Sequence, residues 1–253
     1  MKKNFNFEGK GGEFFSLVLV QMLLTIITFG IYLSWAIVKI KKYLMENLSL
    51  DGKKFSFEGV GGEVFSLLLI QGLLTMITFG IYGAWALVKI RKYFTEKTTY
   101  DGKAFEFNGV GGEVFSLLFI QGLLTMITFG IYFPWAWIKI NKYMLEKTTY
   151  EGKAFGLKAE GGKLFSLVFI QGLLTIITFG IYFSWAFVKI ANYLASQVTY
   201  DDSSFAFEGD GGTLFSINIK GILLTIITIG IYKFWYQMEL FRYYASSTSL
   251  DQK

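Results

Sequence analysis

The chain has 253 residues, of which 53% are hydrophobic, 19% aromatic and 17% charged, and its formal net charge is +5. Soluble domains carry about 25% charged residues, so this composition favours a membrane protein. The chain contains neither cysteine nor histidine, which excludes disulfides, thiol chemistry, the usual zinc sites and histidine acid–base catalysis. The basic balance suits an anionic lipid surface at least as well as nucleic acid.

The sequence repeats one pattern five times at an interval of 50 residues, without insertion or deletion. The units are 1–50, 51–100, 101–150, 151–200 and 201–253, and we expect them to form a single repeat-built domain over 1–253. Leu23-Leu24-Thr25, Gly30-Ile31-Tyr32 and Trp35 recur unchanged in every unit. Equal spacing implies that each unit meets its neighbours in nearly the same way.

The N-terminal stretch "MKKNFNFEGKGGEFF" has two lysines but no short apolar core before a small-residue cleavage site. No removable signal peptide is therefore expected. The apolar run from Phe14 to Tyr32 follows, with 19 residues and no charge in the first four copies. As a helix it would be about 28 Å long, which is enough to cross the hydrocarbon core of a bilayer. The sequence therefore predicts one membrane helix in each unit.

The next segment of each unit predicts an amphipathic helix, as in "WALVKIRKYFTEK" from Trp85 to Lys97. Leu87, Ile90 and Phe94 share one face, with polar residues opposite. Tryptophan, tyrosine and lysine together are typical of a helix lying among lipid headgroups. The lipid-interface candidates are Trp35, Lys39, Lys42, Trp85, Lys89, Lys92, Trp135, Lys139, Lys142, Trp185 and Lys189.

The last segment of each unit predicts a β-hairpin. Asp101-Gly102 lies between two β-prone runs, which is a strong hairpin signal. Phe105 and Phe107 alternate with Ala104 and Glu106, as in a strand with one buried face. We expect neighbouring hairpins to be able to pair into a sheet outside the membrane.

These segments predict an α-helical membrane protein with small β-hairpins, built from five tandem 50-residue repeats of membrane helix, amphipathic interfacial helix and β-hairpin. The cluster Lys39, Lys41 and Lys42 follows the apolar run, and lysine prefers the cytoplasmic side. This favours a helical hairpin that enters and returns in each unit over five crossings that alternate in direction. Closure into a pseudo-fivefold ring and stacking in a row both remain open.

A polar stripe runs along the apolar helix. Gln21, Thr25, Thr28 and Tyr32 lie on one narrow face, which suits hydrogen bonding between packed helices. The alternative is that the stripes line a lumen or polar cavity. The stripe candidates are Gln21, Thr25, Thr28, Gln71, Thr75, Thr78, Gln121, Thr125, Thr128, Gln171, Thr175, Thr178, Lys220, Thr225 and Thr228.

The fifth unit departs from the others. We take Lys220 as the substitute for the glutamine, Lys233 follows the Gly-Ile-Tyr motif, and Glu239 stands where other units have lysine. An ionisable residue in a membrane segment needs a partner, so Lys220 and Glu239 form a candidate intramembrane ion pair. The alternative is a terminal repeat adapted to a different environment.

The motif "LLT-x-ITFGIY-x-x-WA-x-x-K-I-x-K-Y", with the preceding Gly-Gly-Glu and the following Thr-x-Tyr-Asp-Gly, resembles the YjgN-like family of bacterial inner-membrane proteins of unknown function. The closest copy runs from Phe105 to Lys153 and includes Pro134. The resemblance implies a multi-pass protein of the prokaryotic inner (plasma) membrane. It implies no reaction, ligand or binding residue.

Our first functional hypothesis is a multi-pass membrane scaffold that organises lipid and copies of itself through its interfacial helices and hairpins. The alternatives are a channel or transporter lined by the stripes with Lys220, and a soluble solenoid binding module. No acid–base pair stands out, so we expect no enzyme activity, cofactor or metal site. The expected partners are membrane lipids, chiefly anionic, and other copies of the chain, but not nucleic acid.

Overall fold

The computed structural model describes residues 2–251. Every repeat contains a strand, a 17-residue helix, a second helix of 14 or 15 residues and a short strand, in that order. The helices are α1 Gly11–Ile27, α2 Leu33–Glu46, α3 Gly61–Ile77, α4 Gly83–Glu96, α5 Gly111–Ile127, α6 Phe133–Glu146, α7 Gly161–Ile177, α8 Phe183–Gln197, α9 Gly211–Ile227 and α10 Lys233–Ser246. The strands are β1 Lys2–Phe7, β2 Leu48–Leu50, β3 Lys53–Phe57, β4 Thr98–Tyr100, β5 Lys103–Phe107, β6 Thr148–Tyr150, β7 Lys153–Leu157, β8 Val198–Tyr200, β9 Ser203–Phe207 and β10 Thr248–Asp251. The five tandem repeats are thus present in the structure as well as in the sequence.

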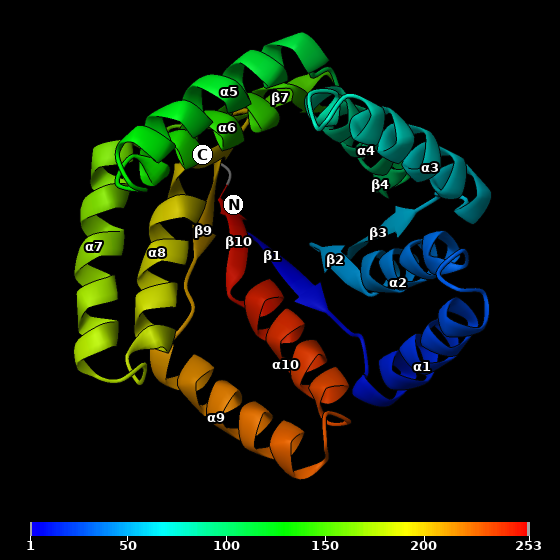
Figure 1. Ribbon diagram of the computed structural model, residues 1–253. Coiled ribbons are helices and arrows are strands. Elements are labelled where there is room, and N and C mark those ends of the chain that lie inside the picture. Colours follow the sequence, from blue (N-terminus) through cyan, green and yellow to red (C-terminus); the bar gives the residue numbers. More distant parts are fainter. Residues whose placement is uncertain (1, 252–253) are drawn as a thin grey trace. The chain divides into compact units, whose positions relative to one another are not determined.

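The chain divides into two compact units whose boundaries cut across the repeats. One unit contains the residues up to Leu17, Asn47–Lys54 and the chain from Lys158 onward, and the other contains Val18–Glu46 and Phe55–Leu157. In the first unit, β2, β1, β10, β9 and β8 pair in that order, all antiparallel, and α8 runs beside β9 (Figure 1). In the second unit, β3, β4, β5, β6 and β7 pair successively, also antiparallel.

The two-residue turn expected at Asp101-Gly102 is present. Both residues have positive φ, 51° and 75°, and Tyr100 pairs with Lys103 across the turn. Positive φ at both positions matches the twist of antiparallel strands and explains the Asp-Gly sequence. Successive hairpins also pair with each other, since Phe55 of β3, in the hairpin formed by β2 and β3, lies opposite Tyr100 of β4. The hairpins are therefore parts of longer sheets and not small separate elements.

The predicted membrane helices are wrong. Among residues 2–251, no helix combines the length and the apolarity that a bilayer crossing needs. The 19-residue apolar run is not one helix, because α1 ends at Ile27 and residues 28–32 form a turn. The predicted class, an α-helical membrane protein with small β-hairpins, is corrected to an α+β fold in which paired helices alternate with strands of antiparallel sheets.

The turn after each long helix is fixed by backbone hydrogen bonds. The Gly30 N–H donates to the Thr25 carbonyl at 2.8 Å, and the Phe29 N–H donates to the Ile26 carbonyl at 3.1 Å. These two bonds form a Schellman motif, which satisfies the last carbonyls of the helix and reverses the chain. Equivalent bonds occur in all five repeats. We call each pair of helices with its turn a helical hairpin.

The core is shared between neighbouring repeats. Phe57 and Val64 of the second repeat pack against Val38 of the first, and Phe57 and Val64 are fully buried. Phe107 and Val114 pack in the same way against Val88. One repeat therefore cannot bury its own strand and helix, which is why neighbours at a fixed spacing are needed.

The apolar face predicted for the second helix is partly wrong. Ala84, Ala86 and Val88 are the buried residues of α4, whereas Leu87 is 40% exposed. Ala84 and Val88 belong to the core that includes Phe107 of the next repeat, so the shared core decides which face is buried.

Candidate functional site

The turn of every helical hairpin presents a large apolar side chain to solvent. Phe79, Phe129 and Phe179 are each 97% exposed, Phe29 is 98% exposed, and Ile229 of the fifth repeat is 94% exposed. Single exposed apolar residues are common, but the same residue at the same place in successive repeats is a built feature. We call residues 26–33 and their equivalents the hairpin tips.

The exposed residue at each tip has a strained backbone. Phe29, Phe79, Phe129, Phe179 and Ile229 have φ between 49° and 51°. Helices that end in a Schellman motif normally place glycine at this position, because the left-handed region costs other residues about 1–2 kcal/mol. An aromatic or β-branched residue there is an outlier of the kind that gathers at functional sites.

Threonine hydroxyls hold the turn. The Thr28 hydroxyl donates to the Leu24 carbonyl at 2.7 Å and accepts from the Tyr32 N–H at 3.0 Å. Thr78, Thr128, Thr178 and Thr228 make the same two bonds. Each of these threonines therefore links the last turn of the long helix to the start of the second helix.

Apolar side chains surround each tip. In the second repeat Met76, Ile77 and Ile81 are 60–70% exposed, and no charged residue occurs between Val64 and Val88. The first, third and fourth repeats have the same exposed positions and the same uncharged stretch. Each helical hairpin thus changes along its length, from charged residues near the sheet to an apolar tip.

The glutamines of the predicted stripe are buried at the base of this apolar region. Gln21, Gln71, Gln121 and Gln171 are 3–5% exposed. The Tyr132 hydroxyl donates to Gln121 Oε1 at 3.2 Å, and Tyr182 bonds Gln171 in the same way. The hydroxyls of Thr25, Thr75, Thr125 and Thr175 donate to the carbonyl of the glutamine one turn earlier. In the third and fourth repeats the stripe therefore brings glutamine and tyrosine of one repeat together.

In the first four repeats, the first of the predicted lipid-interface lysines hydrogen-bonds to the tyrosine at the end of the polar stripe. Lys39, Lys89 and Lys139 donate to the hydroxyls of Tyr32, Tyr82 and Tyr132 at 3.0 Å, and Lys189 donates to Tyr182 at 2.9 Å. The second lysines, Lys42, Lys92 and Lys142, instead form ion pairs of 3.7–3.9 Å with Glu46, Glu96 and Glu146. The first group lies at the border between the apolar tip and the polar base.

The tryptophans of the interface set contact the following repeat. Trp35 lies against Gly61, with its ring centroid 5.7 Å from that of Phe65, and Trp85 lies in the same way against Gly111 and Phe115. Trp185 contacts Gly211, and Trp235 contacts Gly11, so the fifth repeat meets the first through the same residues. The rings of Trp35, Trp85 and Trp185 are half-buried, whereas Trp235 is 36% exposed. Each ring also stacks on the tyrosine three residues earlier, as Trp35 does on Tyr32.

The fifth repeat places Lys220 and Glu239 together. Lys220 Nζ lies 3.3 Å from Glu239 Oε1, and the two side chains are 54% and 30% exposed. The assignment of Lys220 to the glutamine position is wrong, because the 50-residue register aligns it with Val20 and Ile70. Gly221 occupies the glutamine position, and the ring of Tyr236 lies against it.

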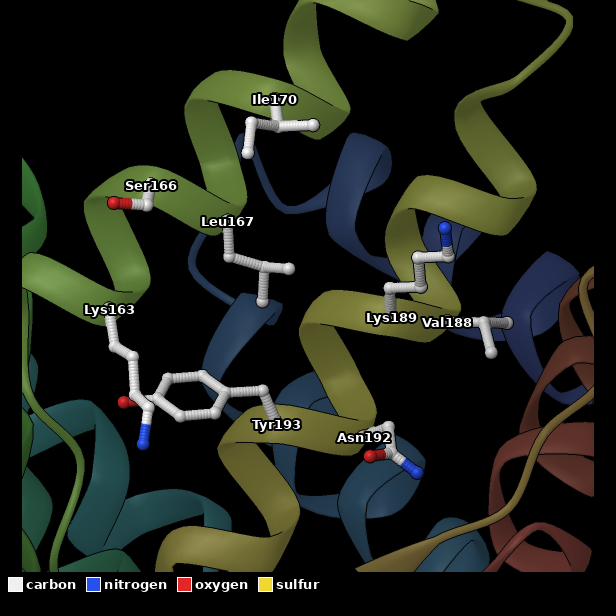
Figure 2. Close-up of a pocket in the computed structure, with 8 residues that line it drawn as sticks. All are labelled: Lys163, Ser166, Leu167, Ile170, Val188, Lys189, Asn192 and Tyr193. Carbon is white, nitrogen blue, oxygen red and sulfur yellow. The ribbon is translucent and has the colours of Figure 1, made fainter.

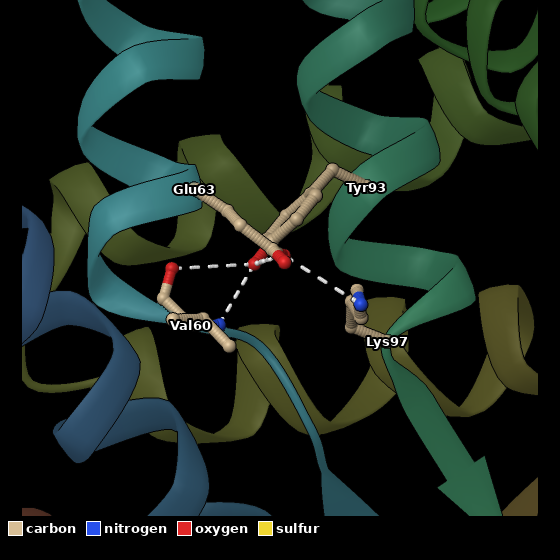
Figure 3. Close-up of polar contacts among 4 residues, drawn as sticks. All are labelled: Val60, Glu63, Tyr93 and Lys97. Carbon is tan, nitrogen blue, oxygen red and sulfur yellow. Dashed lines mark hydrogen bonds and ion pairs between the residues drawn. The ribbon is translucent and has the colours of Figure 1, made fainter.

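A polar network near the sheet end of the helical hairpins escaped the sequence reasoning (Figure 3). The Tyr93 hydroxyl donates to Glu63 Oε2 at 2.8 Å and accepts from the Val60 N–H at 2.8 Å, while Lys97 Nζ lies 3.5 Å from Glu63. Burial, followed by the neighbouring Glu63, raises the pKa of Tyr93. A comparison of the repeats would have revealed this network, because Glu63, Tyr93 and Lys97 recur together in the third repeat.

The third repeat contains the same network. Lys147 Nζ lies 3.2 Å from Glu113, and the Tyr143 hydroxyl accepts from the Val110 N–H at 2.9 Å. Hydrogen bonds from Tyr143 and then from Lys147 lower the pKa of the Glu113 carboxyl. Within residues 2–251, no group of three acidic side chains is placed to hold a metal ion.

Comparison with known proteins yields clear matches over short stretches of the chain. The chain is 48% identical over 51 residues to inner membrane protein YjgN of Escherichia coli (strain K12), and 49% identical over 47 residues to the protein of the same name from Salmonella typhimurium. The first match covers 20% of this chain and 13% of the relative, and the second covers 19% and 12%. No solved structure is detectably similar to the chain.

A family model gives a wider match. It fits the chain five times, over residues 2–61, 53–111, 103–166, 156–207 and 202–253, so that each match corresponds to one repeat. The resemblance noted in the sequence is confirmed by both comparisons. The chain therefore belongs to the family of bacterial proteins of unknown function designated DUF898.

Proposed function

We propose that this protein is a scaffold of the bacterial inner membrane that attaches to lipid through the tips of its helical hairpins. The observation that carries the proposal is the phenylalanine at the turn, which is strained and 97–98% exposed in four repeats, with an isoleucine in the fifth. In water this arrangement has a cost and brings the fold no packing. In lipid hydrocarbon, each phenylalanine would gain about 1.5–3 kcal/mol from its removal from water.

The chemistry along each helical hairpin fits insertion to a limited depth. Gln21 lies six residue steps before Ile27, the last residue of α1, which corresponds to about 9 Å of helix, and Phe29 lies in the turn beyond it. Surface-bound helices typically bury their apolar faces by about 5–10 Å. At that depth the exposed apolar side chains of the tips would lie among acyl chains, and the Tyr32 hydroxyl with Lys39 would lie among the headgroups, where tyrosine and lysine are favoured.

The relatives and the charge support the same environment. The curated relatives are named inner membrane proteins. The chain's net charge of +5 favours the anionic surface of such a membrane. We propose anionic lipids and other copies of this chain as its partners, and we assign it no catalytic role. The threonine hydroxyls of the stripe bond to their own helix, which favours a scaffold over a channel.

The absence of cysteine permits a direct test of insertion. The variant Phe79→Cys takes a single nitroxide label at a tip, and Val60→Cys takes one at the opposite end of α3. Val60 is the matched control, because it is also an exposed apolar residue, at 52%. Both labelled proteins are mixed with phosphatidylcholine–phosphatidylglycerol vesicles, and collisions of each label with oxygen and with a water-soluble nickel complex are measured.

We expect the label at position 79 to become accessible to oxygen and protected from nickel when vesicles are added, while the label at position 60 stays in water. Equal exposure of both labels to nickel, with the protein bound to vesicles, would show that the tips do not enter lipid and would overturn the proposal.

A further inference from the structure

The helical hairpin of the fourth repeat contains a groove that differs in charge from the equivalent region of other repeats. The groove has a volume of about 580 Å³ and lies between α7 and α8 (Figure 2). Lys163 and Leu167 on α7 and Lys189, Asn192 and Tyr193 on α8 are among its lining residues. Small-molecule sites have volumes of about 300–1,000 Å³, so the groove is large enough for one.

The basic character of the groove arises from one exchange, and a second exchange removes the lysine that pairs with the lost carboxylate. Lys163 stands where the second and third repeats have Glu63 and Glu113, and Gln197 stands where they have Lys97 and Lys147. The carboxylate that pairs with lysine in those repeats is therefore missing from the fourth. The tyrosine remains, and the Tyr193 hydroxyl accepts from the Glu160 N–H at 2.9 Å.

The ammonium group of Lys163 has no internal partner. Among residues 2–251, Lys163 makes no hydrogen bond or ion pair, although Glu160 lies one helical turn earlier. Figure 2 shows the Lys163 side chain beside Tyr193, whereas the ammonium group of Lys189, which donates to the Tyr182 hydroxyl, points away from Lys163. The lining thus contains two cations and no carboxylate.

The remaining wall is apolar and leads toward the tip. Leu167 and Ile170 follow Lys163 along α7, whose last residue is Ile177, just before the exposed Phe179. Cations together with an apolar track that ends at a membrane-inserting tip match a lipid with an anionic headgroup. A free anion would use the lysines but not the track.

We propose that the α7–α8 groove binds one anionic phospholipid, with its headgroup at Lys163 and an acyl chain along Leu167 and Ile170 toward Phe179. The other polar groups of the lining have internal partners, since Lys189 donates to the Tyr182 hydroxyl and Asn192 donates to the Phe207 carbonyl. This inference rests on the proposed membrane attachment and adds a specific lipid site to it. The site belongs to the fourth repeat alone among repeats two to four, because Glu63 and Glu113 would repel the headgroup in the other two.

The test compares two single charge removals in the same repeat. Lys163→Gln removes a groove lysine, and Lys158→Gln removes an exposed lysine that does not line the groove. Binding of each protein to dihexanoyl phosphatidylglycerol, below the concentration at which it forms micelles, is measured by calorimetry. We expect Lys163→Gln to weaken binding about fivefold, the ratio that corresponds to about 1 kcal/mol per basic residue at a lipid surface. Lys158→Gln should leave binding unchanged.

A second variant is designed to keep the fold. Lys163→Glu combined with Gln197→Lys installs the Glu–Tyr–Lys network that the second and third repeats already contain, so it should fold and lose the lipid. The reverse exchange, Glu113→Lys with Lys147→Gln, should create a second site in the third repeat.

Three results would contradict the lipid site. Equal losses for the Lys163 and Lys158 variants would mean that only general charge attraction is present. Displacement of the lipid by inorganic phosphate at the same concentration would identify a phosphate site instead. Retained binding by the Lys163→Glu, Gln197→Lys protein would place the lipid elsewhere. Since the short-chain lipid is in solution, these outcomes are independent of tip insertion, which the labelling experiment tests.

Discussion

The indole ring of Trp35 covers Gly61 so closely that a Cβ atom at position 61 would overlap the ring. This contact joins the second helix of one repeat to the start of the next, and Trp85 with Gly111 repeats it. It explains why a tryptophan and a glycine are each kept at a fixed place in the repeats that make this contact. The glycine is required for close approach and not for an unusual backbone angle.

We predict that Gly61→Ala destabilises the protein by about 1–3 kcal/mol, the usual cost of overpacking a well-filled interface. The adjacent Gly62 is the control, because a Cβ atom there would meet open space. Gly62→Ala should change the free energy of unfolding by less than about 1 kcal/mol, with a stabilising sign where the backbone angles suit alanine. Urea denaturation of both variants measures this. Equal stabilities would show that the Trp35 ring moves aside at little cost.

The tips should show opposite effects on stability and on membrane binding. Phe79→Gly removes the left-handed strain, so we predict a gain of up to about 1 kcal/mol in the free energy of unfolding. The same variant loses the exposed ring and should bind vesicles more weakly. Phe79→Ala separates the two effects, because it keeps the strain and loses the ring. Thermal unfolding and vesicle sedimentation of the three proteins check this. A loss of stability in Phe79→Gly would mean that the ring supports the fold.

Tyr243 should make the protein sensitive to alkaline pH. Burial, followed by the charge of Asp210, raises the pKa of Tyr243 from 10.0 to about 12. The unfolded chain therefore ionises this phenol first, so the contribution of Tyr243 to stability is constant below pH 10 and is lost as the pH rises toward 12. Urea unfolding across this range should show a smaller alkaline loss in Tyr243→Phe than in the wild type. That variant should also be about 1 kcal/mol less stable at neutral pH, since it loses the 2.9 Å bond to the Asp210 carbonyl. Identical alkaline slopes would refute the assignment.

At two positions of the fifth repeat, the larger and the smaller side chain have changed places relative to the other repeats, and mutation can restore the original arrangement. The first four repeats have a buried glutamine and a buried alanine at these two positions, as in Gln21 and Ala36, whereas the fifth has Gly221 against the ring of Tyr236. Gly221→Gln alone should clash with the ring, and Tyr236→Ala alone should leave a cavity. We predict that the double variant regains about 0.5–3 kcal/mol relative to the sum of the single changes. A double-mutant cycle by urea denaturation measures the coupling, and additive losses would show that the two positions are independent.

The sequence alone determined the repeat length and the hairpin turn at Asp101-Gly102, because these depend on local backbone chemistry that is written in the residues themselves. It also identified the family, since the motif around Trp35 and Tyr43 is specific. It also predicted the ion pair between Lys220 and Glu239, because both residues depart from the repeat pattern in the same unit.

Tertiary structure decided what the apolar run does. Counting apolar residues could not show that Phe29 takes a left-handed conformation, because a continuing helix and a Schellman turn have the same hydrophobicity. Nor could a pattern within one repeat show that Trp35 covers a glycine of the next repeat, or that Ala84 and Val88, and not Leu87, face the core. Burial in this protein depends on the neighbouring repeat, so each unit acquires its inside and outside only when the chain has folded.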